Sequence, residues 1–468
     1  MIDAPARIRS VSRPTPRPYE SPFGADEIFF STTDSRGIIR SGNRVFTRVS
    51  GYSGHEIFGS AHNIIRHPDM PRAVFQLFWE EIGAGRPIAA YVKNMAKDGS
   101  YYWVMATVVP CQGGFLSVRI KPSTPYFDVA QRVYADLLST EQAIEGGEPR
   151  RRAEAMAASR ARLCEHLREN GFATYDAFMR AALLAEVKNR QALVSYRRSL
   201  QADSASPAVE GALGQVSASC RPIRTFLDRL VCRLDEFDTL NLELAEKSHV
   251  VLDLAENVRL FSLNALLAAT RLGSDGASLG AVASLMQARA NQSDPLFQLL
   301  NDDVVACADL LRGMAFPVAA ASLQVDTLAA FVGELLDGSA DEQPSSSDLG
   351  ALAHCLADEI ERLDAYIGDL DRSVRLLNLH VASLHSDIGV MRMLELNGRI
   401  EAAHASESTA VVALFRTIAE QIDTARHEMD ELARLSRFSV GAEAAMAQVS
   451  RRHVDTIRTQ VTVAASAR

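Results

Sequence analysis

The chain of 468 residues is too long for a single hydrophobic core, and its length predicts about three domains. Hydrophobic residues make up 47% and charged residues 23%, which is ordinary for a soluble globular protein. The net charge of −9 argues against broad attraction to nucleic acid, so we expect no nucleic-acid partner. The six cysteines are scattered without a Cys-x-x-Cys pair, which predicts no metal site and a reducing compartment.

The amino terminus and the hydropathy of the chain favour a cytoplasmic protein. Residues 1–19 mix arginines with prolines where a signal peptide would need an apolar run, and we expect a disordered arm there. No segment reaches the roughly 18 consecutive apolar residues that a membrane-spanning helix needs. We therefore expect no membrane span.

Residues 20–125 are expected to form an α+β domain. Short β-prone runs alternate with turn residues, and one stretch has helical spacing of its apolar residues. The expected strands are 28–31, 38–39, 89–95, 101–110 and 115–120, and the expected helix is 73–82. A five-stranded antiparallel sheet with helices on one face leaves a pocket between them, which is a usual place for a cofactor.

Three motifs in this region stand out: STTD at 31–34, IRHPDMP at 65–71 and KDGSYYWV at 97–104. Together they resemble the sensory PAS domain of bacterial aerotaxis receptors, which hold a flavin and report redox state. The resemblance implies a PAS fold with bound FAD over roughly residues 20 to 125.

The resemblance also implies roles for seven residues. They are Arg66, His67 and Asp69 of the flavin-contacting motif, the polar pocket positions Asn43 and Asn94, and the wall residues Trp79 and Trp103. Asparagine can both donate and accept hydrogen bonds, and arginine stabilises added electron density on a flavin. One departure is Ile88, which stands where the family often has an aromatic residue and so removes a stacking partner.

Three other interpretations of this domain stay open. Asp69 could cap a helix that starts near Met70. His67 or His62 could ligate haem iron in place of a flavin site. The fold could also hold no cofactor and serve as a dimerisation module. We find no motif for a catalytic nucleophile, a nucleotide loop or a metalloprotease, so we expect no enzyme activity.

The remaining sequence predicts helices throughout. A helical connector is expected over residues 126–207, with helical stretches at 129–138, 150–169 and 175–200. Apolar residues then recur every seven positions from Ile223 to Ala265, which predicts a coiled-coil seam. Pro295 and Pro317 are expected to interrupt a later helix.

An internal repeat occupies this helical part, with FSLNALLAATRLG at 261–273 and MLELNGRIEAAHA at 393–405. Both copies resemble the signalling tip of methyl-accepting chemotaxis receptors. Turns near 273–276 and 406–409 would fold each copy into a long antiparallel coiled-coil hairpin. We expect the hairpins at 208–336 and 350–468, joined by a linker at 337–349, to pair within one chain as a pseudo-dimer, with a homodimer as the alternative.

The resemblance implies that tip residues contact neighbouring receptors, a chemotaxis histidine kinase and its coupling adaptor. The matching positions are Asn264, Arg271, Asn397, Glu401, His404 and Glu407. The first copy has Ala268 where the family has glutamate, and the second has His404 where the family has arginine. Two functions therefore stay open: an aerotaxis or energy-taxis transducer coupled to the kinase, and a redox-responsive scaffold that binds other chemoreceptors.

Overall fold

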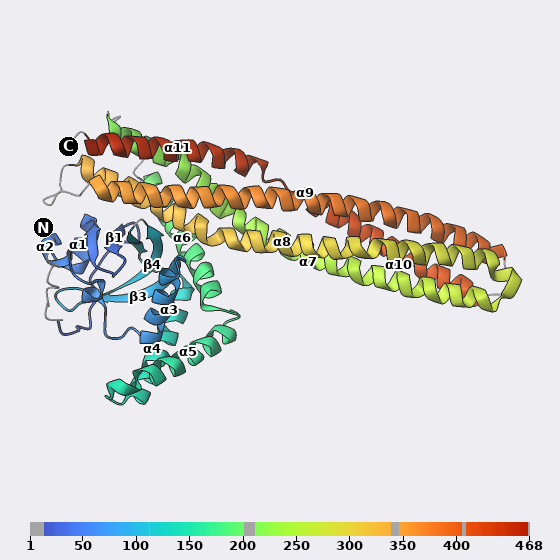
Figure 1. Cartoon of the computed structure of the whole chain (residues 1–468), viewed down its shortest axis with the longest axis horizontal. Helices are drawn as coiled ribbons and strands as arrows, with labels where there is room; N and C mark the ends of the chain where they lie inside the picture. Colours follow the sequence, from blue (N-terminus) through green and yellow to red (C-terminus); the bar gives the residue numbers. More distant parts are fainter. Residues whose placement is uncertain (1–13, 112, 201–210, 338–345, 405–408, 467–468) are drawn as a thin grey trace, which may run out of the picture. The chain divides into compact units, whose positions relative to one another are not determined.

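The computed structural model describes residues 14–111, 113–200, 211–337, 346–404 and 409–466 (Figure 1). The chain divides into two compact units. Unit 1 comprises residues 1–231, 315–363 and 446–468, and unit 2 comprises residues 232–314 and 364–445. The described residues do not include most of the expected amino-terminal arm. They also leave out Glu407 and most of the turn expected near 406–409.

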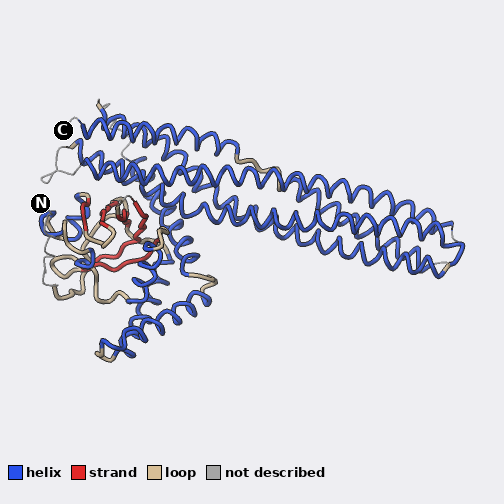
Figure 2. The backbone as a smooth tube through the Cα atoms, in the orientation of Figure 1, coloured by secondary structure: helices blue, strands red, loops and turns tan. Residues whose placement is uncertain are grey.

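The sheet of unit 1 has five strands in the order β2-β1-β5-β4-β3, and every neighbouring pair is antiparallel. This confirms the fold predicted from the sequence. Its strands are β1 (Ile28–Asp34), β2 (Ile39–Gly42), β3 (Ile88–Met95), β4 (Tyr101–Cys111) and β5 (Gly114–Ile120). Asp34 closes the first turn, because its carboxylate accepts hydrogen bonds from the backbone of Arg36 and Ile38. Figure 2 shows these strands in red and the helices in blue.

Short helices connect β2 to β3. They are α1 (Arg44–Ser50), α2 (Gly54–Ile57), the 3-10 turn η1 (His62–Ile65) and α3 (Arg72–Gly83). Asn43 caps α1 by accepting a hydrogen bond from the backbone of Phe46, and Gly51 ends the helix at φ 70°. Phe29 of β1 packs against Phe46 of α1, so these helices share a core with the sheet.

The connector packs against the sheet through aromatic contacts. It contains α4 (Pro125–Glu145), η2 (Pro149–Arg151), α5 (Arg152–Glu169) and α6 (Tyr175–Leu200), close to the expected helical stretches. Phe127 of α4 contacts Tyr91 of β3 and Trp103 of β4. Glu186 of α6 is fully buried and accepts hydrogen bonds from the Tyr91 hydroxyl and from the backbone of Ser123 and Thr124.

The long helices are α7 (Ala212–Arg271), α8 (Ala277–Leu336), α9 (Ser346–His404), α10 (Thr409–Leu435) and α11 (Gly441–Ser466), with the 3-10 turn η3 (Gly273–Gly276). In unit 1, Phe331 of α8 packs edge-on against Phe30 of β1, and Glu334 accepts hydrogen bonds from Asn43 and from the backbone of Arg44. The Glu334 carboxylate therefore helps to cap the start of α1, although it lies on a different helix.

In unit 2, helices of both expected hairpins pack together. The turn predicted at 273–276 is η3, where Gly273 adopts φ 62°. The predicted seam of α7 begins in unit 1 and continues in unit 2, and it is buried at all seven positions: Ile223, Leu230, Phe237, Leu244, Val251, Val258 and Ala265. Lys247 of α7 pairs with Glu428 of α10 at 2.8 Å, and Ser293 of α8 donates to Asp387 of α9 at 2.7 Å.

One expectation about these helices is wrong, and one helix break was not expected. Helix α8 runs through both Pro295 and Pro317, so neither proline interrupts it, although each removes one backbone donor. The last arm of the second hairpin consists of two helices, because α10 ends at Leu435 and α11 begins at Gly441. At that break the hydroxyl of Ser436 donates to Asn378 of α9, and the Asn378 amide donates back to the Ser436 carbonyl.

One described helix, α8, passes a test for membrane spans based on length and apolar composition, with a mean hydropathy of 1.6. A little over half of the apolar window, 56%, is buried inside the protein. The mostly buried core helices of soluble proteins can have the same length and apolar composition.

Candidate ligand-binding site

A cavity of about 110 Å³ lies between the sheet and the helices η1 and α3. Apolar side chains of α3 and the sheet form most of its wall, including Phe75, Phe78, Ile82, Val92 and Val108. Strands β3, β4 and β5 each contribute every second residue, because side chains alternate between the two faces of a sheet. The sequence predicted a pocket in this place.

Two of the predicted polar residues, Asn94 and Arg66, line this cavity. Asn94 of β3 is 2% exposed, and its Nδ2 has no hydrogen-bond partner within the described structure. Arg66 follows η1, forms a backbone bridge with Asn94, and holds its guanidinium 3.9 Å from the centre of the Phe75 ring. A buried amide donor without a partner is costly, so its position in the cavity wall indicates a place for a ligand acceptor.

The cavity wall also contains Arg119, which the sequence did not mark as a site residue, in contact with His62, the other histidine considered for haem. Arg119 of β5 is 2% exposed, and its Nη2 lies 2.6 Å from Nε2 of His62. Burial lowers the pKa of Arg119 to about 10, which leaves it cationic at neutral pH. Burial, and then the charge of Arg119, lower the pKa of His62 to about 3, so that imidazole is neutral. The signal in the sequence was a lone arginine inside an otherwise uncharged strand.

Four of the predicted residues do not line the cavity, because other contacts hold them. His67 is buried, but its Nδ1 accepts a hydrogen bond from the backbone of Asp69. Asp69 pairs with Lys93 at 2.6 Å and caps no helix, since α3 begins two residues beyond Met70. Asn43 caps α1, as described above. Trp103 lies on the opposite face of the sheet, against Phe127 and Tyr134 of α4.

The seventh residue, Trp79, lines the cavity and is 46% exposed. Its indole leans over the turn at Gly37, where a Cβ atom would lie 2.9 Å from the ring. Phe115 of β5 meets the same indole edge-on. Ile88 packs nearby with Ile82 and Val108, and Phe78 and Phe115 pack against this cluster.

The amino-terminal region of this chain is similar to known proteins. The PAS fold matches residues 40–114. The amino-terminal part of this chain is a PAS domain. The aerotaxis receptor of Escherichia coli (strain K12) is 35% identical over 131 residues, which span 27% of this chain and 26% of that receptor.

Two other proteins are similar to part of this chain. The nitrogen fixation regulatory protein of Klebsiella pneumoniae is 28% identical over 83 residues, or 18% of this chain and 17% of that protein. The light-state structure of the blue-light photoreceptor Aureochrome1 LOV is 27% identical and covers 25% of this chain and 91% of that one, with a TM-score of 0.19. The chain spans about a quarter or less of the length of the Escherichia coli and Klebsiella pneumoniae relatives.

Outside the PAS domain, the tip residues lie near the ends of the helices in unit 2. Asn264, Arg271, Asn397 and His404 are exposed, and Glu401 is half-buried. Between them, Gly398 lies against Phe415 of α10, where a Cβ atom would approach the ring to 2.1 Å. Exposed leucine, isoleucine and methionine side chains accompany the tip residues: Leu263, Leu267, Met393, Leu396 and Ile400.

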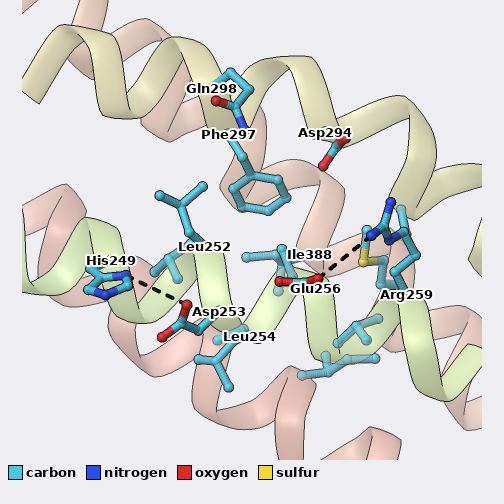
Figure 3. Close-up of a pocket in the computed structure, with 17 residues that line it drawn as sticks. His249, Leu252, Asp253, Leu254, Glu256, Arg259, Asp294, Phe297, Gln298 and Ile388 are labelled. Carbon is cyan, nitrogen blue, oxygen red and sulfur yellow. Dashed lines mark ion pairs between the residues drawn. The ribbon is translucent and has the colours of Figure 1, made fainter.

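A second cavity, of about 430 Å³, lies among α7, α8, α9 and α10 of unit 2 (Figure 3). Phe297 and Leu252 point into it, and small residues such as Ala255, Ala290 and Ala425 line it. On α7, His249 pairs with Asp253 and Arg259 with Glu256, and Asp294 of α8 also lines the cavity. None of its described lining residues has a buried polar atom without a partner, so it indicates loose helix packing.

Proposed function

We propose that this protein is a cytoplasmic, non-catalytic sensor of redox state or oxygen that acts in aerotaxis or energy taxis. In this proposal the PAS domain holds FAD in the cavity between sheet and helices. The observation that carries the proposal is Asn94, whose buried Nδ2 faces the cavity without a partner. The similarity of the PAS domain to an aerotaxis receptor supports the same function.

The residues of the cavity fit a flavin. Asn94, Arg66 and Arg119 would hold it by donating hydrogen bonds to the carbonyl and nitrogen acceptors of the ring. A bound flavin supplies a ring whose charge and protonation change on reduction. The cavity of about 110 Å³ is smaller than the roughly 300 Å³ or more of common ligand pockets, so a ring would displace the half-exposed Trp79 at its edge.

Haem is the weaker candidate. Iron ligation would need a free imidazole nitrogen in the cavity. His67 does not line the cavity, and Nε2 of His62 already meets the guanidinium of Arg119 at 2.6 Å. A ligand for haem iron would therefore require the Arg119–His62 contact to break.

The signal would leave the cavity through β3. Asn94 faces the cavity, while Tyr91, three residues earlier, faces the other side and donates to Glu186 of α6 at 2.8 Å. A change in hydrogen bonding at Asn94 would shift this strand and bias two packings of the connector, which is a population shift between conformations. The helical hairpins would pass that bias to a partner.

We propose a chemotaxis histidine kinase and its coupling adaptor as the first partners. The exposed apolar side chains near the tip residues support a surface that docks on another protein. The scaffold that binds other chemoreceptors is the second candidate, because Ala268 and His404 depart from the family tip. Retention of other receptors without kinase or adaptor in a pull-down with the full chain would favour this scaffold.

The absorbance spectrum of the natively purified protein tests the cofactor. Flavin should give two bands near 370 and 450 nm, on general cofactor spectroscopy. Asn94→Ala and Arg66→Ala should each weaken FAD binding about 10-fold or more, because each removes a donor worth roughly 1–3 kcal/mol, while helical circular dichroism is retained.

The exposed Asn170→Ala and Arg36→Ala serve as matched controls and should bind like the wild type. Full occupancy in both cavity variants would remove these residues from the site. A colourless protein that takes up no added FAD would contradict the proposed function.

A further inference from the structure

Arg119 is a buried cation without an acidic partner. Its Nη1 donates to the Ser31 hydroxyl at 3.0 Å and to the Ser117 carbonyl at 3.4 Å, and its Nη2 meets His62. These contacts use three of the five guanidinium donors. Within the described residues no carboxylate forms an ion pair with Arg119, and no Asp or Glu lines the cavity.

Such an isolated charge is expensive, because removing a cation from water costs several kcal/mol unless a counter-charge is near. The rings of Phe29 and Phe46, at 5.9 and 5.4 Å from the guanidinium, offset part of this cost. The titratable groups around it add no negative charge: His62 on η1, Arg66 beside η1, and Tyr102 on β4, which has Tyr52 near it. The cavity wall is therefore positive.

His62 is held as an acceptor by this arrangement. Its Nε2 faces a guanidinium that can only donate, so the ring proton must be on Nδ1. Protonating Nε2 as well would place two cations in contact. His62 therefore resists taking up a proton while Arg119 stays beside it.

We propose that Arg119 receives the electron-rich edge of the bound ring and holds its reduced form as an anion. This inference rests on the proposed flavin function and names the residue that sets the charge of the reduced state. Two electrons from a soluble low-potential reductant and one proton from solvent enter the ring. The ring thus gains one net negative charge beside Arg119, and His62 stays neutral.

The decisive experiment is the midpoint potential of the full chain loaded with FAD, measured against pH with dithionite as the reductant. One proton taken up with two electrons gives a slope of about 30 mV per pH unit between pH 6 and 8, since a tenfold change is 29.6 mV for two electrons. A slope of about 60 mV per pH unit means two protons and overturns the proposal. This measurement needs no variant.

Variants then assign the effect to Arg119. Arg119→Gln should lose affinity for reduced FAD about tenfold more than for oxidised FAD, which makes the midpoint about 30 mV more negative at pH 8. Arg119→Lys keeps a cation and should lie between the Gln variant and the wild type, and the exposed Arg36→Gln should match the wild type. An FAD-loaded Arg119→Gln protein with the wild-type midpoint would overturn the proposal.

The two proposals fail in different ways. If the full chain takes up no FAD, the proposed function fails before any potential is measured. If FAD binds and the slope is about 60 mV per pH unit, only the role of Arg119 is lost.

Discussion

Burial of a single ionisable side chain, Glu359, makes the stability of this protein depend on pH. Glu359 of α9 is 2% exposed, and one carboxylate oxygen accepts a hydrogen bond from Arg362 at 2.9 Å while the other has no partner. Burial raises the pKa of Glu359 to about 7, against an ordinary value of 4.5, and the nearby Arg362 offsets only part of that effect.

We predict that Glu359 destabilises the fold as pH rises from about 4.5 to about 7. In that range the folded protein holds the proton and the unfolded chain does not, so the free energy of unfolding falls by about 3 kcal/mol in all. Glu359→Gln should remove this part of the loss, as measured by urea unfolding at pH 5 and pH 8. The nearby exposed Glu361→Gln keeps Glu359 and should retain the wild-type loss. Parallel pH profiles for the wild type and Glu359→Gln would contradict the prediction.

Strand β3 connects the cavity to the connector because its two faces have different partners. Val92 and Asn94 line the cavity, whereas Tyr91 lies against Phe127 of α4 and Glu186 of α6. Glu186 also accepts hydrogen bonds from both Ser123 and Thr124, at the start of α4. One buried carboxylate thus joins the sheet, the start of α4 and α6.

We predict that Tyr91→Phe weakens this junction without emptying the cavity. The change removes one donor from a buried carboxylate and should cost about 1–2 kcal/mol of unfolding free energy. Hydrogen exchange in α6 should become several-fold faster, while FAD occupancy stays at the wild-type level. Tyr101→Phe on the neighbouring strand is the control, since the Tyr101 hydroxyl makes no hydrogen bond to a described residue. Unchanged exchange in α6 would show that the hydroxyl does not join these elements.

At the scale of the whole molecule, helices of the two expected hairpins pack together within one chain. Unit 2 contains residues 232–314 and 364–445, which come from both hairpins. Asp387 of α9 pairs with Arg289 and accepts a hydrogen bond from Ser293, both on α8. His380 of α9 pairs with Asp303 of α8 in the same manner.

We predict that Asp387→Ala destabilises the full chain by about 1–3 kcal/mol. The loss is smaller than for a fully buried pair, because the Arg289 side chain is 30% exposed. Thermal unfolding of the full chain measures it, with the exposed Asp369→Ala as the control.

Light scattering of the wild type should give the mass of one chain at low concentration. An obligate homodimer with no folded monomer on dilution would contradict the pairing within one chain.

Several features were predictable because they depend on near neighbours in the sequence. The alternation of apolar residues predicted the strands, and the seven-residue repeat predicted the buried seam from Ile223 to Ala265. Glycine at 273 predicted the turn between α7 and α8. The break near Ser436 was missed, because it is stabilised by Asn378, which lies 58 residues away.

The motif residues show where local reasoning ends. A motif places Arg66, His67 and Asp69 together in the chain, but only the packing of η1 against β3 decides that Arg66 lines the cavity while His67 and Asp69 turn to other partners. Arg119 shows the opposite situation. It belongs to no motif, but its position in β5 places its guanidinium beside His62, which is 57 residues away in the sequence.

The sequence by itself determined which segments become strands, helices and turns, because those choices rest on backbone preferences and on the period of apolar residues. The tertiary structure alone decided which side chains share the cavity and how buried charges such as Arg119 and Glu359 are surrounded. Those properties arise from the burial and pairing of groups far apart in the chain, where desolvation and charge outweigh local preference.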